Sequence, residues 1–323
     1  MATFRLGTRG SQLALFQANA VAALLRERAD ASCEIVIIRT SGDRLSEASL
    51  SEIGGKRLFV KEIEDALLAG DIDLAVHSSK DMPAVLPEGL EVGAVLPRED
   101  PRDAVVLPGG GAQGLSLDGV LRALGPTPRL GTSSVRRSAQ LARLLPAARF
   151  MPIRGNLDTR LRKLDSGDFD AIILASAGLR RLGYGERVSA MLPVDACVPA
   201  PGQGIIAVEV RAGDERVRAA VARIDDEDAA VALRAERAVV TRLGGGCQMP
   251  IGAYADVTKD GITITGIVVS IDGARSVRAT ASGPADRAQA LGTDTAEQLL
   301  SRGADDILAG VHQAQAAVEG LQP

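Results

Sequence analysis

The sequence predicts an α/β protein in which two α/β domains are followed by a small α+β domain that carries an antiparallel sheet. Up to about residue 210, short apolar strands alternate with helical segments, which is the pattern of largely parallel sheets. In the last third, two Asp-Gly pairs separate segments of alternating polarity, which indicates hairpins. At 323 residues, the chain is also too long for one ordinary core.

The first α/β unit is predicted from its apolar spacing and its turn residues. Ser11 is the expected N-cap of the first helix, and Gly70 ends the second. The polar, glycine-bearing stretch 41–58 is long enough for a mobile loop or lid. The expected elements are, in order, a strand at 3–8, a helix at 11–29, a strand at 33–40, a helix at 59–70 and a strand at 72–77.

The second unit repeats this order after a boundary loop at 109–111. Its expected elements are a strand at 129–131, a helix at 135–145, a strand at 149–153, a helix at 159–166 and a strand at 170–175. A stiff connection at 199–204 then leads to a buried strand at 205–210. In the last third we expect helices at about 226–243, 284–300 and 305–318 around hairpins turning at 260–261 and 272–273.

Composition excludes several classes of function. The two histidines, His77 and His312, are far apart in sequence, which argues against most triad and histidine-metal chemistries. Three cysteines without a Cys-x-x-Cys pair fit neither a disulfide framework nor a zinc site, so we expect no metal and a reducing, cytoplasmic location. Aromatic residues are only 2% of the chain, which argues against single-stranded nucleic acid. We also expect no signal peptide and no membrane span.

Positive charge is concentrated in one segment of an otherwise acidic chain. The formal net charge is −4, yet residues 129–163 hold nine basic residues against Asp158 alone, which is +8 for the segment and −12 for the remainder. A basic island of this size suggests a small polyanionic ligand rather than a nucleic acid. Guanidinium groups bind carboxylates through two hydrogen bonds, so a ligand with several carboxylates is expected.

Two strand–turn–helix junctions are candidate anion sites. Residues 8–11 and 131–134 each lead into a helix N-terminus, where free N–H groups and the helix dipole favour an anion. Arg136 and Arg137 lie in the first turn of the second helix, where a cation is unfavourable unless an anion is adjacent. The alternative is that both arginines are solvated on an exposed turn.

Two further residues could carry chemistry. Asp81 follows the third strand, where ligands bind in open α/β sheets, and could move protons or stabilise a developing cation. The alternative for Asp81 is an Asx turn before Met82-Pro83. Cys247 follows three glycines, 244–246, so its thiol could be a nucleophile or a covalent attachment point, or simply a buried cysteine after a helix. We interpret Cys33 and Cys197 as structural.

Motifs that are found together in one protein family follow one another along the chain. They lie at residues 6–11, 54–56 with 58–62, 77–83, 98–103, 131–137, 154–160, 177–183, 199–204 and 245–252. With these motifs in this order, the chain resembles over nearly its whole length the porphobilinogen deaminase, or hydroxymethylbilane synthase, family of tetrapyrrole biosynthesis.

The resemblance implies two α/β domains like those of periplasmic binding proteins, enclosing a cleft, and a third domain with the cofactor cysteine. The first domain is then discontinuous, because the chain returns to it near residues 198–211. The implied domains are 1–103 with 198–216, 104–197 and 217–323.

The resemblance also implies the chemistry. Four porphobilinogen molecules are joined head to tail on a covalently bound dipyrromethane, with release of ammonia and the linear tetrapyrrole. The resemblance leaves open whether this product feeds haem biosynthesis or another tetrapyrrole pathway. Cys247 holds the cofactor through a thioether and Asp81 is the catalytic carboxylate. Cofactor-binding residues are Ser78, Lys80, Thr132, Ser133, Arg136 and Arg137, and substrate-binding residues are Arg9, Arg154, Arg160, Arg181 and Gln203. The resemblance favours a monomer.

Two other functions remain open at this point. A non-catalytic binding protein of periplasmic type for a carboxylated ligand would explain the arginines but gives Cys247 no role. A cysteine-nucleophile acyl transferase would need a base near the thiol, and the sequence places no histidine nearby.

Overall fold

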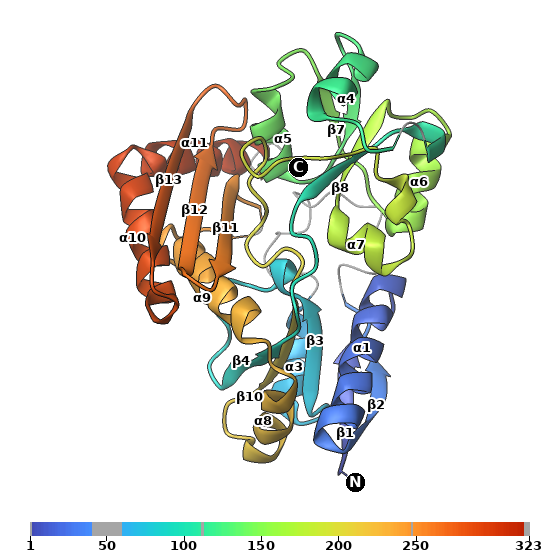
Figure 1. Ribbon diagram of the computed structural model, residues 1–323, viewed down its shortest axis with the longest axis vertical. Helices are drawn as coiled ribbons and strands as arrows, with labels where there is room; N and C mark the ends of the chain where they lie inside the picture. The colour runs from blue at the N-terminus through green and yellow to red at the C-terminus, as the bar shows by residue number, and fades with distance from the viewer. Residues whose placement is uncertain (1, 41–59, 111–112, 247, 320–323) are drawn as a thin grey trace.

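The computed structural model describes residues 2–40, 60–110, 113–246 and 248–319, and the side chains up to residue 313. Three sheets form three bodies, with the first domain at the bottom of Figure 1, the second at the top and the C-terminal domain at the left. The predicted fold class, two α/β domains and a small α+β domain with an antiparallel sheet, is confirmed. No helix among the residues described is long and apolar enough to span a membrane.

The first domain is a five-stranded sheet whose order includes a strand from late in the chain. The order is β2 (Ala31–Ile37), β1 (Ala2–Thr8), β3 (Leu74–Ser78), β10 (Ile206–Arg211) and β4 (Leu90–Val95). Strand β1 is parallel to β2 and β3, whereas β10 is antiparallel to both of its neighbours. The helices are α1 (Gln12–Ala29), α3 (Lys61–Ala69) and α8 (Glu215–Val221).

The second domain repeats this architecture. Its sheet has the order β7 (Arg149–Met151), β6 (Arg129–Gly131), β8 (Ala171–Ala175), β5 (Asp103–Val106) and β9 (Ala190–Met191). Its helices are α4 (Leu117–Leu124), α5 (Val135–Ala142), α6 (Leu157–Asp165) and α7 (Ser176–Arg181). Strand β6 is parallel to both neighbours and β5 is antiparallel to both. Because β6 and β8 are parallel, their carboxyl ends meet at one edge of the sheet.

The C-terminal domain packs three helices on an antiparallel meander. Its strands are β11 (Ile251–Thr258), β12 (Gly261–Val269) and β13 (Ser276–Gly283), and its helices are α9 (Glu227–Arg242), α10 (Ala288–Ser301) and α11 (Ala304–Glu319). Both predicted Asp-Gly hairpins are confirmed. At the second, the Asp272 carboxylate accepts the Ala274 N–H and closes the turn.

Several elements differ from the sequence-based expectation. Strand β2 occupies Ala31–Ile37 rather than 33–40, because α1 ends at Asp30 in a left-handed conformation (φ 49°) that leads directly into the strand. It is an edge strand, and Cys33 on it is half-buried and packs against the core of the first domain. Strands β4, β5 and β9 and helices α4, α7 and α8 were not expected. The predicted loop at 41–58 lies outside the described residues.

The chain crosses between the first two domains twice. Residues 96–102 lead from β4 to β5, and residues 192–205 return from β9 to β10. The buried carboxylate of Glu236, on α9, joins both crossings to the C-terminal domain. It binds Arg98 Nη1 at 2.6 Å and accepts the N–H groups of Gly202 at 2.6 Å and Ala255 at 2.7 Å.

Candidate active site

A cavity of about 250 Å³ is lined by residues of all three domains and of the return crossing. The segment after β3 contributes Lys80 and Asp81, and the second domain contributes Arg136, Arg137 and Arg160. Basic side chains thus surround one exposed carboxylate. The C-terminal domain adds a largely apolar wall made of Leu233, Val240, Met249 and Ile251.

Lys80 and Asp81 reach the cavity because β3 ends in a single 3-10 turn, Ser79–Asp81. Lys80 Nζ donates to Gln203 Oε1 on the return crossing at 3.4 Å. Burial, reinforced by the nearby positive charge of Arg137, lowers the pKa of Lys80 to about 8. At neutral pH the ammonium group therefore keeps most of its charge, and an anionic ligand would stabilise this charged form.

The hydroxyl groups of the second junction hold the backbone. Ser134 caps α5 by accepting the Arg137 N–H. Thr132 Oγ1 accepts the Ser134 N–H at 3.2 Å, and Ser133 Oγ donates to the Ile153 carbonyl at 2.8 Å. Thr132 and Ser133, predicted to bind the cofactor, thus have internal partners that shape the turn.

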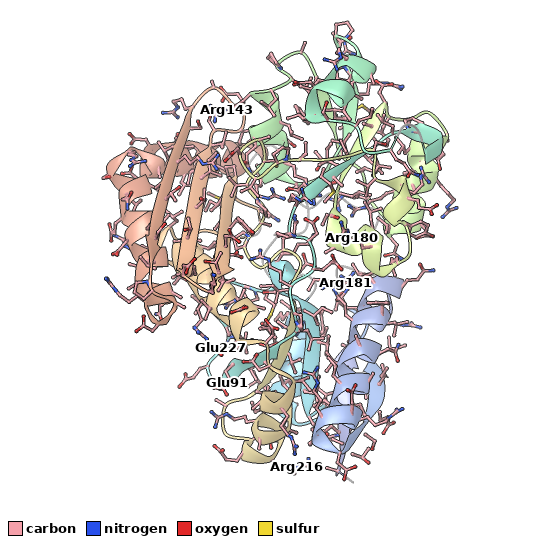
Figure 2. All side chains as sticks on the ribbon, viewed as in Figure 1. Glu91, Arg143, Arg180, Arg181, Arg216 and Glu227 are labelled. Atoms are coloured by element: carbon pink, nitrogen blue, oxygen red, sulfur yellow. The ribbon has the colours of Figure 1, made fainter. Side chains whose placement is uncertain are left out.

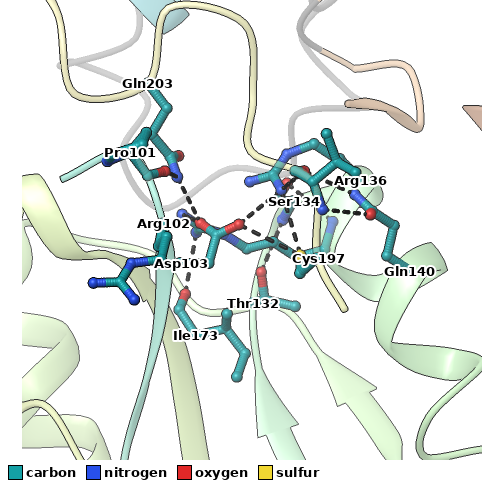
Figure 3. A network of polar contacts seen from close by, with 12 residues as sticks. Pro101, Arg102, Asp103, Thr132, Ser134, Arg136, Gln140, Ile173, Cys197 and Gln203 are labelled. Atoms are coloured by element: carbon teal, nitrogen blue, oxygen red, sulfur yellow. Dashed lines mark hydrogen bonds and ion pairs between the residues drawn. The ribbon is translucent and has the colours of Figure 1, made fainter. Parts of the chain in front are cut away.

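Arg136 and Arg137 share one buried carboxylate, that of Asp103 at the start of β5. Figure 3 shows Asp103 beside Arg136. Arg136 Nη1 binds Asp103 Oδ2 at 2.7 Å, and Arg137 Nε donates to Oδ1 at 2.9 Å. The alternative of solvated arginines is wrong, since both guanidinium groups are buried. The anion that offsets their position in the first turn of α5 is a residue of this chain.

The same network contains the thiol of Cys197 and the side-chain amide of Gln203, which both contact Asp103. Although burial alone would raise the pKa of Asp103, the guanidinium groups of Arg136 and Arg137 hold it well below its usual range. Burial, together with the negative charge of Asp103, raises the pKa of Cys197 to about 12. Cys197 is therefore a protonated structural thiol, as interpreted from the sequence.

Arg160 is the third arginine of the predicted set that lines the cavity. Its Nε donates to the Gly155 carbonyl at 2.8 Å, which orients the side chain across the first turn of α6. Burial, followed by the charge of Arg137, lowers the pKa of Arg160 to about 10. Arg160 therefore remains charged at neutral pH and would gain stability from an anion.

The remaining predicted residues are not in the cavity lining given by the described residues. Ser78 Oγ exchanges hydrogen bonds with Gln17 on α1. Arg181 donates to the Gly204 carbonyl at 2.6 Å, and Figure 2 shows it where α7 approaches α1. Arg9 and Arg154 are both half-buried.

The basic island of the sequence is not one surface. Of its nine basic residues, only Arg136, Arg137 and Arg160 line the cavity. Arg129 forms an exposed ion pair with Asp170 on the outside of the second domain, and Arg143 is exposed at the far end of α5 (Figure 2). Charge density along the chain therefore overestimates the cationic surface of the site.

Two residues of the site were missed by sequence reasoning. Asp103 belongs to the motif at 98–103, but no local pattern shows that a carboxylate there meets two arginines more than thirty residues later. Arg237 lines the cavity from α9 and donates to the Ala84 carbonyl at 2.8 Å. From the sequence, Arg237 can be recognised only as a residue of a predicted helix. It reaches the cavity because the C-terminal domain packs against the other two domains.

The predicted attachment point, Cys247, lies outside the described residues, but Gly246 and Met249 on either side of it line the cavity. The lining fits a group that has several carboxylates and apolar rings. Arg136, only 4% exposed, keeps Nε and Nη2 without a partner among the described residues, and the apolar wall lies across from the cations.

Comparisons with known proteins decide the family. Residues 4–219 match the family model "Porphobilinogen deaminase, dipyromethane cofactor binding domain", and residues 230–301 match "Porphobilinogen deaminase, C-terminal domain". The chain belongs to the porphobilinogen deaminase family. It is 47% identical to the porphobilinogen deaminase of Geobacter metallireducens, over 98% of this chain and 96% of that protein.

Other relatives agree. The chain is 47% identical to the porphobilinogen deaminase of Syntrophotalea carbinolica, over 95% of each chain. Among solved structures, an ancestral cationic amino acid solute binding protein is 16% identical with a TM-score of 0.41, over 68% of this chain and 86% of that one.

Family membership confirms several predictions from the sequence. The protein is an enzyme of the transferase class in tetrapyrrole biosynthesis, with a domain that binds a dipyrromethane cofactor. The alternative of a non-catalytic binding protein is wrong, because the chain matches both domains of a catalytic family and not only the α/β pair.

Proposed function

We propose that the protein joins four porphobilinogen molecules head to tail in the cavity described above, and releases ammonia and hydroxymethylbilane. The observation that carries this proposal is the convergence of Lys80, Arg136, Arg137 and Arg160 around Asp81. Porphobilinogen has two carboxylates and one amine that must leave. Guanidinium groups bind the carboxylates, and a single carboxylate can stabilise the cation that forms when ammonia departs.

Asp81 is the proposed catalytic residue. Its side chain is exposed to the cavity, at the end of a 3-10 turn fixed by the ladder between β3 and β10. A carboxylate in this place can accept the pyrrole N–H of the substrate and offset positive charge on the ring. The positive charge of Arg160 lies close enough to interact with this carboxylate.

The cofactor would be held by the chain's own cations and by one thioether. When bound, the dipyrromethane supplies the acceptor pyrrole on which new units are added. Arg136 and Arg137 would bind its carboxylates together with Lys80, and Cys247 would be its covalent anchor. Gly246, next to Cys247, lines the cavity and supports this assignment.

Other assignments rest on less. Four residues stay predictions as substrate-binding residues: Arg9, Arg154, Arg181 and Gln203. Three stay predictions as cofactor-binding residues: Ser78, Thr132 and Ser133. We also propose a cytoplasmic monomer without nucleic acid or membrane partners, on the basis of composition and family.

The domain bounds are likewise proposals. We propose 1–102 with 198–224 for the first domain, 103–197 for the second and 225–323 for the third. Asp103 lies in the second sheet, and Val217, Val221 and Ile224 pack in the core of the first domain, which supports bounds slightly different from those implied by the resemblance.

The test separates catalysis from binding. Asp81→Asn keeps the shape of the side chain, so the holoenzyme should retain its KM for porphobilinogen and lose about 10²- to 10⁴-fold in kcat. Arg160→Ala should instead raise KM. Asp170→Asn, which alters an exposed carboxylate bound to an arginine, is the control. A kcat for Asp81→Asn within twofold of wild type would refute the assignment.

A further inference from the structure

The carboxylate of Asp103 collects an unusual number of hydrogen-bond donors. Oδ2 binds Arg136 Nη1 at 2.7 Å and lies 3.4 Å from Cys197 Sγ. Oδ1 binds Arg137 Nε at 2.9 Å and Nη2 at 2.8 Å, and Gln203 Nε2 at 2.9 Å. The Asp103 side chain is completely buried, so among the described residues these donors take the place of water around its carboxylate.

This network lies where both chain crossings pass the site (Figure 3). Asp103 begins β5 directly after the first crossing, and Gln203 belongs to the return crossing. Gln203 also donates to the Pro101 carbonyl at 2.6 Å and accepts from Lys80. Contacts thus run from Lys80 in the first domain through Gln203 and Asp103 to the two arginines of the second domain.

We propose that Asp103 is a positioning residue for catalysis, which aims Arg136 and Arg137 into the cavity and sets their place relative to Lys80. The inference rests on the proposed function of the cavity. Asp103 does not touch the cavity itself, since it is not among the described lining residues. It acts through the guanidinium groups and through the Gln203 amide.

The geometry shows what Asp103 fixes. Arg136 uses Nη1 for Asp103 and for the Val198 carbonyl, which leaves Nε and Nη2 for a ligand. Arg137 is held by Asp103 on one side and donates Nη1 to the Ile173 carbonyl at 3.1 Å on the other. A single internal anion therefore offsets two adjacent cations while leaving donors of Arg136 directed to the cavity.

Only a carboxylate can satisfy this environment. The four nitrogen donors approach both oxygens, so each oxygen must accept. In Asp103→Asn the amide keeps one oxygen, and its NH₂ group must face either Arg136 or the pair formed by Arg137 and Gln203. One guanidinium group must then rotate away, and the two cations lose their shared anion.

The experiment compares Asp103→Asn with Asp170→Asn, whose carboxylate also binds an arginine but on the surface. On folded holoenzyme, checked for cofactor by intact mass, Asp103→Asn should lower kcat/KM for porphobilinogen by about 10- to 100-fold, mainly through KM. Asp170→Asn should leave both constants unchanged. If Asp103→Asn lowers only the unfolding temperature and leaves KM unchanged, the role is merely structural and the proposal is overturned.

A double variant tests whether Asp103 acts through the arginine. If it does, Asp103→Asn with Arg136→Gln loses less in kcat/KM than the product of the two single losses, whereas independent roles give the full product and contradict the proposal. Wild-type enzyme that fails to convert porphobilinogen would refute the proposed function instead, whatever the variants do.

A measurement on wild-type holoenzyme covers the case in which Asp103→Asn does not fold. The Nε–H signal of Arg137, assigned by its loss in Arg137→Lys, should exchange slowly with water because it is donated to a buried carboxylate. Fast exchange would show that Asp103 does not fix this guanidinium group, and would overturn the proposal.

Discussion

Replacing Arg98 should destabilise the fold more than replacing any exposed arginine in an ion pair. Arg98→Met keeps the apolar stem and removes the guanidinium group, which binds Glu236 at 2.6 Å and donates to the Gln203 carbonyl at 3.0 Å. It also lies over the ring of Tyr254, 5.1 Å from its centroid. The substitution therefore removes the side-chain contacts by which Arg98 links the first crossing to the C-terminal domain.

The magnitude follows from the burial of Glu236. Its side chain is 0% exposed, so without Arg98 its charge keeps only the N–H groups of Gly202 and Ala255. Breaking a buried ion pair costs about 3–5 kcal/mol, and the lost cation–π contact adds about 0.5–1 kcal/mol. For a protein of this size, we expect the unfolding temperature to fall by roughly 5–9 °C.

Thermal unfolding of the holoenzyme measures this effect. The control is Arg129→Met, since the Arg129–Asp170 pair is 44% and 38% exposed and should contribute less than about 1 kcal/mol. Arg98→Met combined with Glu236→Gln should recover part of the loss, because the buried charge is removed. Equal shifts for Arg98→Met and Arg129→Met would refute the reasoning.

Two more predictions follow from single residues. Because the pKa of Lys80 is lowered to about 8, its positive charge is present below that pH and lost above it, so kcat/KM should decline above pH 8. Lys80→Arg should move this decline to higher pH. A pH profile of kcat/KM that does not move would contradict the role of Lys80. Gly204 has φ +90°, and a Cβ at this position would overlap the Glu99 carbonyl oxygen. Gly204→Ala should therefore lower the unfolding temperature clearly more than Gly167→Ala, since Gly167 has a similar φ of +86° but open space around it. Similar shifts in the unfolding temperature would show that the crossings are not tightly packed.

Local patterns predicted much of the fold. The hairpins at Asp260 and Asp272 and the helix that starts at Ser11 depend on contacts within a few residues, and the structure has them. Strands β4, β5 and β9 were not expected, and each of them pairs only with strands that are distant in the sequence. The place of β10 between β3 and β4 depends on long-range pairing, and only the resemblance to a known family indicated it.

The site could be predicted in part. Residue types and motifs identified Lys80, Arg136, Arg137 and Arg160 among the cations that line the cavity, but not Arg237. They could not show that Asp103 is the anion beside Arg136 and Arg137, since that contact depends on the pairing of β5 with β8. The count of basic residues in the segment 129–163 also included Arg129 and Arg143, whose side chains are exposed on the surface and not in the cavity lining.

The central claim is that the cavity serves a dipyrromethane held permanently by Cys247. The most direct test is the intact mass of purified, active protein. We predict a mass above that of the 323-residue chain by two porphobilinogen units less two ammonia molecules, and its loss in Cys247→Ser. Active protein with the unmodified mass, or an unchanged adduct in Cys247→Ser, would contradict the account.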